Sequence, residues 1–215
     1  MLLLLASALA LGMLHTVAPD HVAAVGVFVS RRPGWRRAVS YGARWGLGHS
    51  ITIVVVGALV LMARLRLPTA FESQVDRLVG VVLIVLGVQA MRRAWRARGT
   101  TSHVHRHGAA SPHTHVHPHA HDDGGKLLGI GMLHGLAGSG ALVVALPSAA
   151  AASTAGSIGY LAAFGAGTIV AMSVLAAALG AAVQAAAVTS ARIERRAVLS
   201  AGAISIVVGV WWMLR

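Results

Sequence analysis

Six long apolar stretches constrain the fold of this chain more than any other feature. A transmembrane helix needs about 20 consecutive, mostly apolar residues. The stretches that meet or approach this length are residues 2–29, 38–62, 78–95, 127–148, 157–188 and 197–214. Charged residues make up only 11% of the chain, too few to cover the surface of a soluble domain. The sequence therefore predicts an all-α polytopic membrane protein with six transmembrane helices.

The basic residues between these stretches predict how the chain is oriented. Thirteen follow the first, third and fifth stretches: Arg31, Arg32, Arg36, Arg37, Arg92, Arg93, Arg96, Arg98, Arg106, Lys126, Arg192, Arg195 and Arg196. The opposite side has four, namely Arg64, Arg66, Arg77 and Arg215. Because cytoplasmic loops carry the excess of Lys and Arg, we expect a multi-pass protein of the cell (inner or plasma) membrane with both termini outside. The net charge of +12 is thus loop charge for orientation in a lipid bilayer, and a nucleic-acid partner is not expected.

The sequence also contains an internal repeat. The tetrapeptide Gly-Met-Leu-His at residues 12–15 recurs at residues 131–134, a spacing of 119. Further matches are Tyr41, Gly46 and Gly48 with Tyr160, Gly165 and Gly167 at the same spacing, and Gly87 and Met91 with Gly209 and Met213 at 122. Three stretches per copy is an odd number, so the copies lie in opposite orientations. We expect two inverted three-helix repeats, residues 1–98 and 126–215, as in many secondary transporters. A duplicated scaffold without transport is the alternative.

Four histidines and one carboxylate lie inside the apolar stretches: His15, Asp20, His21, His49 and His134. Polar side chains at membrane depth are costly and usually functional, although any single histidine could instead make a hydrogen bond between helices. Imidazoles with one carboxylate suit Ni²⁺, Co²⁺, Zn²⁺ or Cu²⁺. These five residues are therefore the predicted metal site.

The segment from His15 to His21 needs a break in the helix to form such a site. On a straight helix His15 and Asp20 are about 140° apart, and His15 and His21 about 240° apart. Pro19 lacks an N–H and clashes with the carbonyl of His15, four residues back. We expect the first helix to break near Pro19, so that the three side chains converge and backbone carbonyls become free to line a cavity. In the second repeat Ser139 and Gly140 replace the Asp-His pair, which leaves open whether His134 is a ligand.

The motif His15-x4-Asp20-His21, followed by Leu-Gly-His-Ser at residues 47–50, resembles the nickel/cobalt transporter (NiCoT/NicO) superfamily. The six-stretch form, with Gly-Leu-Ala-Gly-Ser at residues 135–139, looks most like the short urease-accessory and efflux-like branch. The resemblance implies a role for His15, Asp20 and His21 in metal selection and passage. The larger permeases of this superfamily have eight spans and place the motif in the second.

Eight further histidines gather between the two repeats, in the predicted cytoplasmic loop of residues 99–125. They are His103, His105, His107, His113, His115, His117, His119 and His121. The segment is rich in His, Gly, Ala and Ser and lacks a core-forming pattern, which predicts a flexible loop. Repeated His-x-His spacing favours weak binding of several metal ions, as a metal antenna or buffer. A linker with incidental histidines is the alternative.

Together these features predict a secondary transporter of a divalent transition metal, most simply Ni²⁺ or Co²⁺ with Zn²⁺ as an alternative, and with a slight preference for efflux. The metal is cargo, and no permanently bound cofactor is expected. A membrane protein that binds nickel and delivers it to a metalloenzyme is the second hypothesis. The candidate protein partners are further copies of this chain in a homo-oligomer, or a protein of metalloenzyme maturation.

An enzyme is not expected. A metallohydrolase would need a further carboxylate near the motif as general base, and none is there. The absence of cysteine excludes a thiol relay in these residues, and the absence of a phosphate-binding G-x-x-x-x-G-K-[ST] loop excludes a nucleotide-driven motor.

Overall fold

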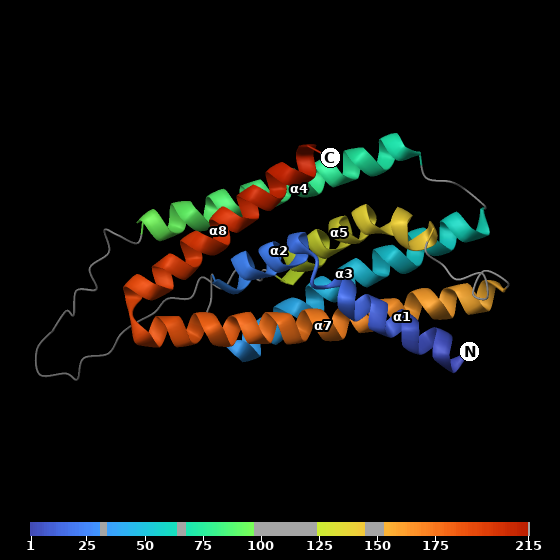
Figure 1. The fold of residues 1–215 in the computed structure, drawn as a ribbon, viewed down its shortest axis with the longest axis horizontal. Coiled ribbons are helices and arrows are strands. Elements are labelled where there is room, and N and C mark those ends of the chain that lie inside the picture. The colour runs from blue at the N-terminus through green and yellow to red at the C-terminus, as the bar shows by residue number, and fades with distance from the viewer. Residues whose placement is uncertain (31–33, 64–67, 97–123, 145–152, 215) are drawn as a thin grey trace, which may run out of the picture.

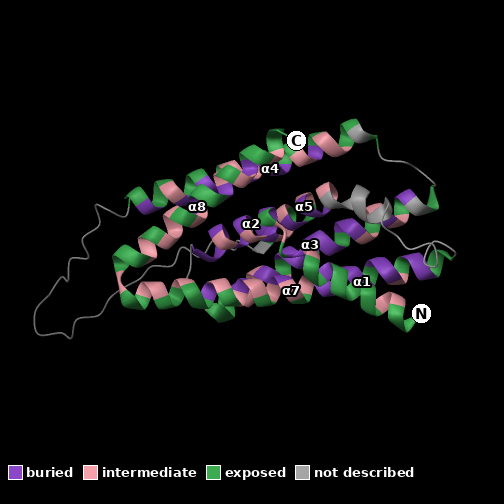
Figure 2. Cartoon of the chain, in the orientation of Figure 1, coloured by how far each residue is buried: buried purple, intermediate pink, exposed green. Residues whose placement is uncertain are grey.

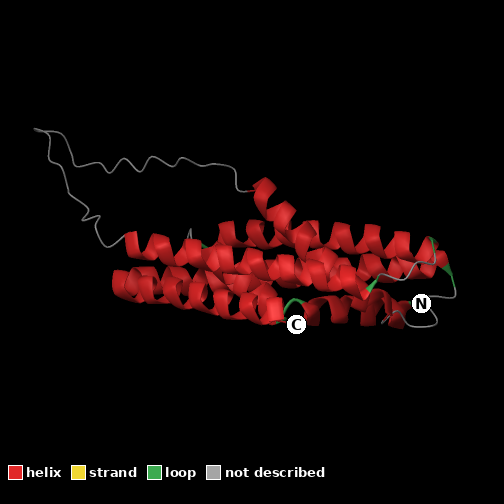
Figure 3. Cartoon of the chain, turned by 90° about the horizontal axis from the view of Figure 1, so that it is seen from above, coloured by secondary structure: helices red, strands yellow, loops and turns green. Residues whose placement is uncertain are grey.

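The computed structural model describes residues 1–30, 34–63, 68–96, 124–144 and 153–214, and the regular structure in these residues is α-helical (Figure 3). The helices are α1 (Leu2–His15), α2 (Pro19–Ser30), α3 (Trp35–Met62), α4 (Thr69–Arg96), α5 (Gly124–Val144), α7 (Thr154–Thr189) and α8 (Ala191–Leu214). The eight loop histidines lie outside the described residues. The predicted antenna therefore stays a prediction.

The helices are long and apolar enough to cross a membrane several times. Within the described residues α3, α4, α7 and α8 each qualify alone, and α1 with α2 qualify as one bent span. Apolar side chains such as Val55, Val174 and Val207 are more than half exposed on the outside of the bundle, where lipid would cover them. Figure 2 shows the same division along the ribbon, with many buried residues on α2 and α3 and many exposed ones on α8. The all-α polytopic class is confirmed, whereas the number six stays a prediction because the fourth expected stretch runs past the described end of α5.

The first apolar stretch breaks where the sequence predicted. α1 ends at His15, α2 begins with Pro19, and the two helices are bent by 61°. Proline suits the first position of a helix because its missing N–H would have no partner there. Asp20 in the first turn of α2 adds a negative charge where the helix dipole favours one. The break is thus explained by local chemistry alone.

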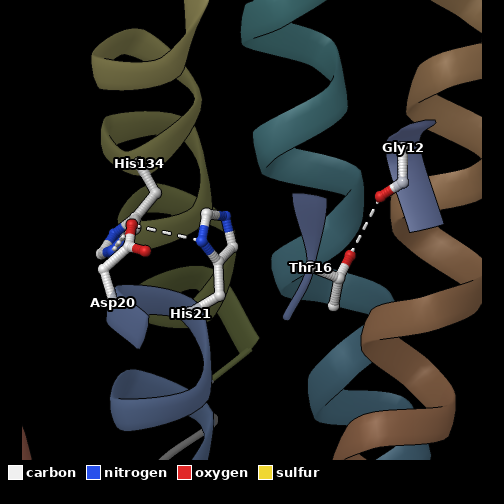
Figure 4. Close-up of polar contacts among 5 residues, drawn as sticks. All are labelled: Gly12, Thr16, Asp20, His21 and His134. Atoms are coloured by element: carbon white, nitrogen blue, oxygen red, sulfur yellow. Dashed lines mark hydrogen bonds and ion pairs between the residues drawn. The ribbon is translucent and has the colours of Figure 1, made fainter. Parts of the chain in front are cut away.

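The carbonyl oxygens in the last turn of α1 have hydrogen-bond partners at this break. The amides of residues 16–18 donate to the carbonyl oxygens of residues 13–15 at 3.1–3.3 Å, in tight turns that continue α1. The carbonyl oxygen of Gly12, one turn before Thr16, accepts the hydroxyl of Thr16 at 3.2 Å (Figure 4). It also accepts the hydroxyl of Thr168 in α7 at 3.2 Å. Threonine side chains commonly repair helix breaks in this way, so the protein itself satisfies this oxygen.

The bundle is built from pairs of long helices that pack side by side (Figure 1), and glycines stand where their backbones approach most closely. α3 and α7 run antiparallel, since Gly42 lies against Met172, Gly46 against Ile169 and Gly57 against Leu161. α1 packs on α7, α5 packs on α3, and α4 pairs with α8 beside α2. Small residues at these crossings let the helix backbones approach closely.

The closest approaches occur in matching pairs. A Cβ at Gly12 would overlap the carbonyl oxygen of Phe164, and a Cβ at Gly131 would overlap that of Trp45. The two glycines are 119 residues apart, and so are the two aromatic residues, with Trp45 preceding Phe164. The same holds for Gly48 against Leu128 and Gly167 against Leu9. The spacing found in the sequence therefore recurs in the contacts between helices.

Candidate metal centre

The five intramembrane residues named from the sequence lie together, although they come from four helices. His15 is the last residue of α1, Asp20 and His21 stand in the first turn of α2, His49 is in α3 and His134 in α5. Four are almost fully enclosed, with exposed fractions of 4% or less, and His15 is half-buried. The break before Pro19 directs the end of α1 and the start of α2 toward the same point.

His21 lies at the centre of the cluster. Its ring centroid is 4.7 Å from that of His15, 5.0 Å from His49 and 5.4 Å from His134. One ring nitrogen from each of His15, His21 and His49 lies within 4.8 Å of the other two. Bonds from a transition metal to imidazole are about 2.0–2.1 Å long, so a small inward movement of these side chains would complete three bonds to one ion.

Asp20, the one carboxylate of the cluster, contacts both His21 and His134. Its Oδ2 atom is 3.2 Å from His21 Nδ1 and 3.7 Å from His134 Nε2, so one carboxylate lies between two imidazoles (Figure 4). A carboxylate that accepts the Nδ1–H of a histidine fixes the ring and directs its Nε2 toward a metal. At these ion-pair distances Asp20 can orient His21 in this way, and it links α2 to α5 through His134.

Several imidazole nitrogens of the cluster have no hydrogen-bond partner among the described residues. These are the Nε2 atom of His15 and both ring nitrogens of His21, His49 and His134, although His21 Nδ1 and His134 Nε2 lie within ion-pair distance of Asp20. Leaving a buried polar group without a partner costs about 1–3 kcal/mol, which a purely structural core avoids. Unpartnered nitrogens that face one another are what a site for a transition-metal ion requires, and the donor set of imidazoles with one carboxylate fits Ni²⁺, Co²⁺, Zn²⁺ or Cu²⁺.

Sequence reasoning missed two aromatic residues at this site. The Phe164 ring is 5.5 Å from His15, and the Trp45 ring is 5.1 Å from His134. Both side chains are 1% exposed. A signal for them existed, because Phe164 follows Trp45 by the 119 residues that also separate His15 from His134.

The second repeat contributes one imidazole to the site. Thr168 stands at the position that corresponds to His49, and its hydroxyl donates to the carbonyl oxygens of Gly12 at 3.2 Å and Phe164 at 3.1 Å. Its side chain therefore holds helices together where His49 offers free nitrogens. The cluster is asymmetric although the helices around it are related.

The fold and this cluster define the class: a multi-pass, all-helical membrane protein with histidines and a carboxylate enclosed among its helices. The family described as cytochrome c biogenesis protein transmembrane region matches residues 21–211, and the chain belongs to this family. No solved structure matches the chain.

Three curated relatives extend this comparison. The urease accessory protein UreH of Bacillus sp. (strain TB-90) is 31% identical over 165 residues, which are 75% of this chain and 69% of the relative. The Arabidopsis thaliana chloroplast protein FOR GROWTH AND FERTILITY 1 is 34% identical over 39% of this chain and 23% of its own length. FOR GROWTH AND FERTILITY 2, from the same plant, is 29% identical over 75% of this chain and 42% of its own length. The matches thus cover less than half of either chloroplast protein.

Proposed function

We propose that this protein is a secondary transporter of divalent transition-metal ions, with Ni²⁺ and Co²⁺ as its cargo, in line with the nickel/cobalt transporter resemblance. The observation that carries the proposal is the enclosed cluster of His15, Asp20, His21, His49 and His134 at a helix break inside a membrane bundle. Broken helices that hold an ion site among the spans are typical of secondary transporters. The relative named for urease, a nickel enzyme, supports the choice of metal.

The architecture that we propose for this transporter is six spans in two inverted repeats. The matching contacts of Gly12 with Phe164 and of Gly131 with Trp45 support it, as does the reciprocal contact between Gly80 and Gly209 in the α4–α8 pair. In this arrangement the cluster lies between the repeats. The distribution of arginine supports external termini and a cytoplasmic histidine-rich loop.

A second candidate is an accessory protein that binds nickel in the membrane and passes it to a maturing metalloenzyme without net transport. The relative's name, urease accessory protein, favours it. Thiol chemistry is not a candidate, because these 215 residues contain no cysteine.

Uptake into proteoliposomes separates the two candidates. Purified protein is reconstituted, and entry of Ni²⁺, Co²⁺, Zn²⁺ and Cu²⁺ is followed with and without a pH gradient. We expect saturable flux of Ni²⁺ and Co²⁺, and its loss in His49→Thr, which gives the first repeat the residue that the second repeat has as Thr168. Metal binding without flux in the unmodified protein would favour the accessory function and contradict transport.

Deletion of residues 103–121 tests the role proposed for the eight loop histidines. If they act as an antenna, the deletion raises the metal concentration at half-maximal flux several-fold but leaves the maximal rate and the metal ranking unchanged. Changes at His15 or His49 are expected to alter the rate or the ranking. Flux curves for both kinds of variant make the comparison. Loss of flux at saturating metal in the deletion variant would place the loop in the passage itself.

A further inference from the structure

Two aromatic side chains make the same kind of contact at two places around the cluster of histidines and Asp20. Phe164 of α7 packs on His15, and Trp45 of α3 packs on His134, with ring centroids 5.5 and 5.1 Å apart. A glycine stands three residues before each histidine, Gly12 before His15 and Gly131 before His134. The carbonyl oxygen of Phe164 lies against Gly12, and that of Trp45 lies against Gly131. The two contacts are thus copies of one arrangement.

The antiparallel register of α3 and α7 places these aromatics on opposite sides of the cluster. Because Ser50 lies against Gly165, Phe164 is level with about residue 51 of α3. At a rise of 1.5 Å per residue, Trp45 and Phe164 are separated by roughly 9 Å along the helix axis. His49 lies between these two levels. An ion at the cluster therefore has one aromatic ring toward each end of the bundle.

These rings close the cluster in a way that side-chain rotation can reverse. The helix backbones are in contact at Gly12 and Gly131, so they leave little room for the helices themselves to move closer. A neutral aromatic ring offers an ion no ligand to replace its water, so it forms a barrier while it covers a histidine. Rotation of the ring about its own side-chain bonds uncovers that histidine without breaking the helix crossing.

We propose that Trp45 and Phe164 are the two gates of the metal passage, each closing the cluster toward one face of the membrane. The proposal rests on the transport function proposed above. α3 starts next to Arg36 and Arg37 on the proposed cytoplasmic side, so Trp45 is the inner gate and Phe164 the outer gate.

A cysteine placed in the cluster of this cysteine-free chain tests the gates. His49→Cys puts a thiol at a fully buried position, and a small impermeant thiol reagent is applied to right-side-out and inside-out vesicles. In this background we expect Trp45→Ala to speed labelling from the cytoplasmic face about tenfold or more, and Phe164→Ala to do so from the outer face. The matched control is Phe28→Ala, because Phe28 is a buried aromatic of α2 whose ring centroid is 5.5 Å from that of Trp45.

The outcomes separate the gates from transport, since labelling requires no flux. The gates are overturned if neither variant speeds labelling, if both open the same face, or if the Phe28 variant has an equal effect. Side-specific labelling with the two faces exchanged supports the gates and reverses the orientation. If labelling is side-specific but the unmodified protein shows no flux, the two aromatic barriers are supported and the proposed transport function is contradicted. If gel filtration shows that the alanine variants are not folded, Trp45→Leu and Phe164→Leu are tested in their place.

Discussion

Replacement of His21 by alanine is expected to abolish metal transport, with flux reduced by about 100-fold or more. His21 is the one imidazole whose ring contacts those of His15, His49 and His134, and it also pairs with Asp20 at 3.2 Å. Its removal takes away a proposed metal ligand and leaves the carboxylate without its nearest partner. Initial rates in proteoliposomes measure the loss, and calorimetric titration with Ni²⁺ reports whether binding falls with it.

Asp20→Ala is expected to have a comparable effect, because the carboxylate orients His21 and reaches His134 on another helix. The matched control is Ser30→Ala. Ser30 is buried on the same helix, and its hydroxyl bonds to the carbonyl oxygen of Val27 at 2.8 Å, one turn earlier. The control is expected to transport at the rate of the unmodified protein, and all variants should insert in the membrane equally. Near-normal flux in both His21→Ala and Asp20→Ala would remove these residues from the site.

Substitution of Gly131 by alanine is expected to destabilise the bundle by about 1–3 kcal/mol or more. A Cβ at this position would overlap the carbonyl oxygen of Trp45, and backbone cannot turn aside as a flexible side chain can. Gly129→Ala is the control: it lies two residues earlier on α5, and a Cβ there would have no neighbour within 4 Å. Thermal unfolding in detergent compares the two variants. Equal unfolding temperatures would show that α3 and α5 do not cross as described.

Gly129 and Gly131 also illustrate a limit of sequence reading. Both are glycines in the same apolar stretch, and no local pattern distinguishes the one at a crossing from the one facing open space. The repeat does distinguish them, because Gly131 has a counterpart in Gly12 whereas position 10, the counterpart of Gly129, is alanine. Long-range self-similarity thus carried information about packing that local composition did not.

The class of protein and the break before Pro19 were predicted correctly from the sequence alone. The sequence also singled out five polar intramembrane residues that lie together in the structure, and their role as a metal site stays a prediction. The physical reason is that each is a local or additive property. Apolar length decides whether a helix suits the membrane, a proline removes a backbone donor wherever it stands, and the cost of burying a histidine or a carboxylate applies at every membrane-spanning position.

Only the tertiary structure decided how these residues meet. It placed Asp20 between His21 and His134. It directed the hydroxyls of Thr16 and Thr168 to the carbonyl oxygen of Gly12. It also packed Trp45 on His134 and Phe164 on His15. The contacts of Asp20 with His134, of Thr168 with Gly12 and of the two aromatic rings with the histidines join separate helices, so they depend on where and at what angle the helices cross. Those crossings are decided jointly by glycines and bulky side chains far apart in the chain, and no single segment contains both halves of such a contact.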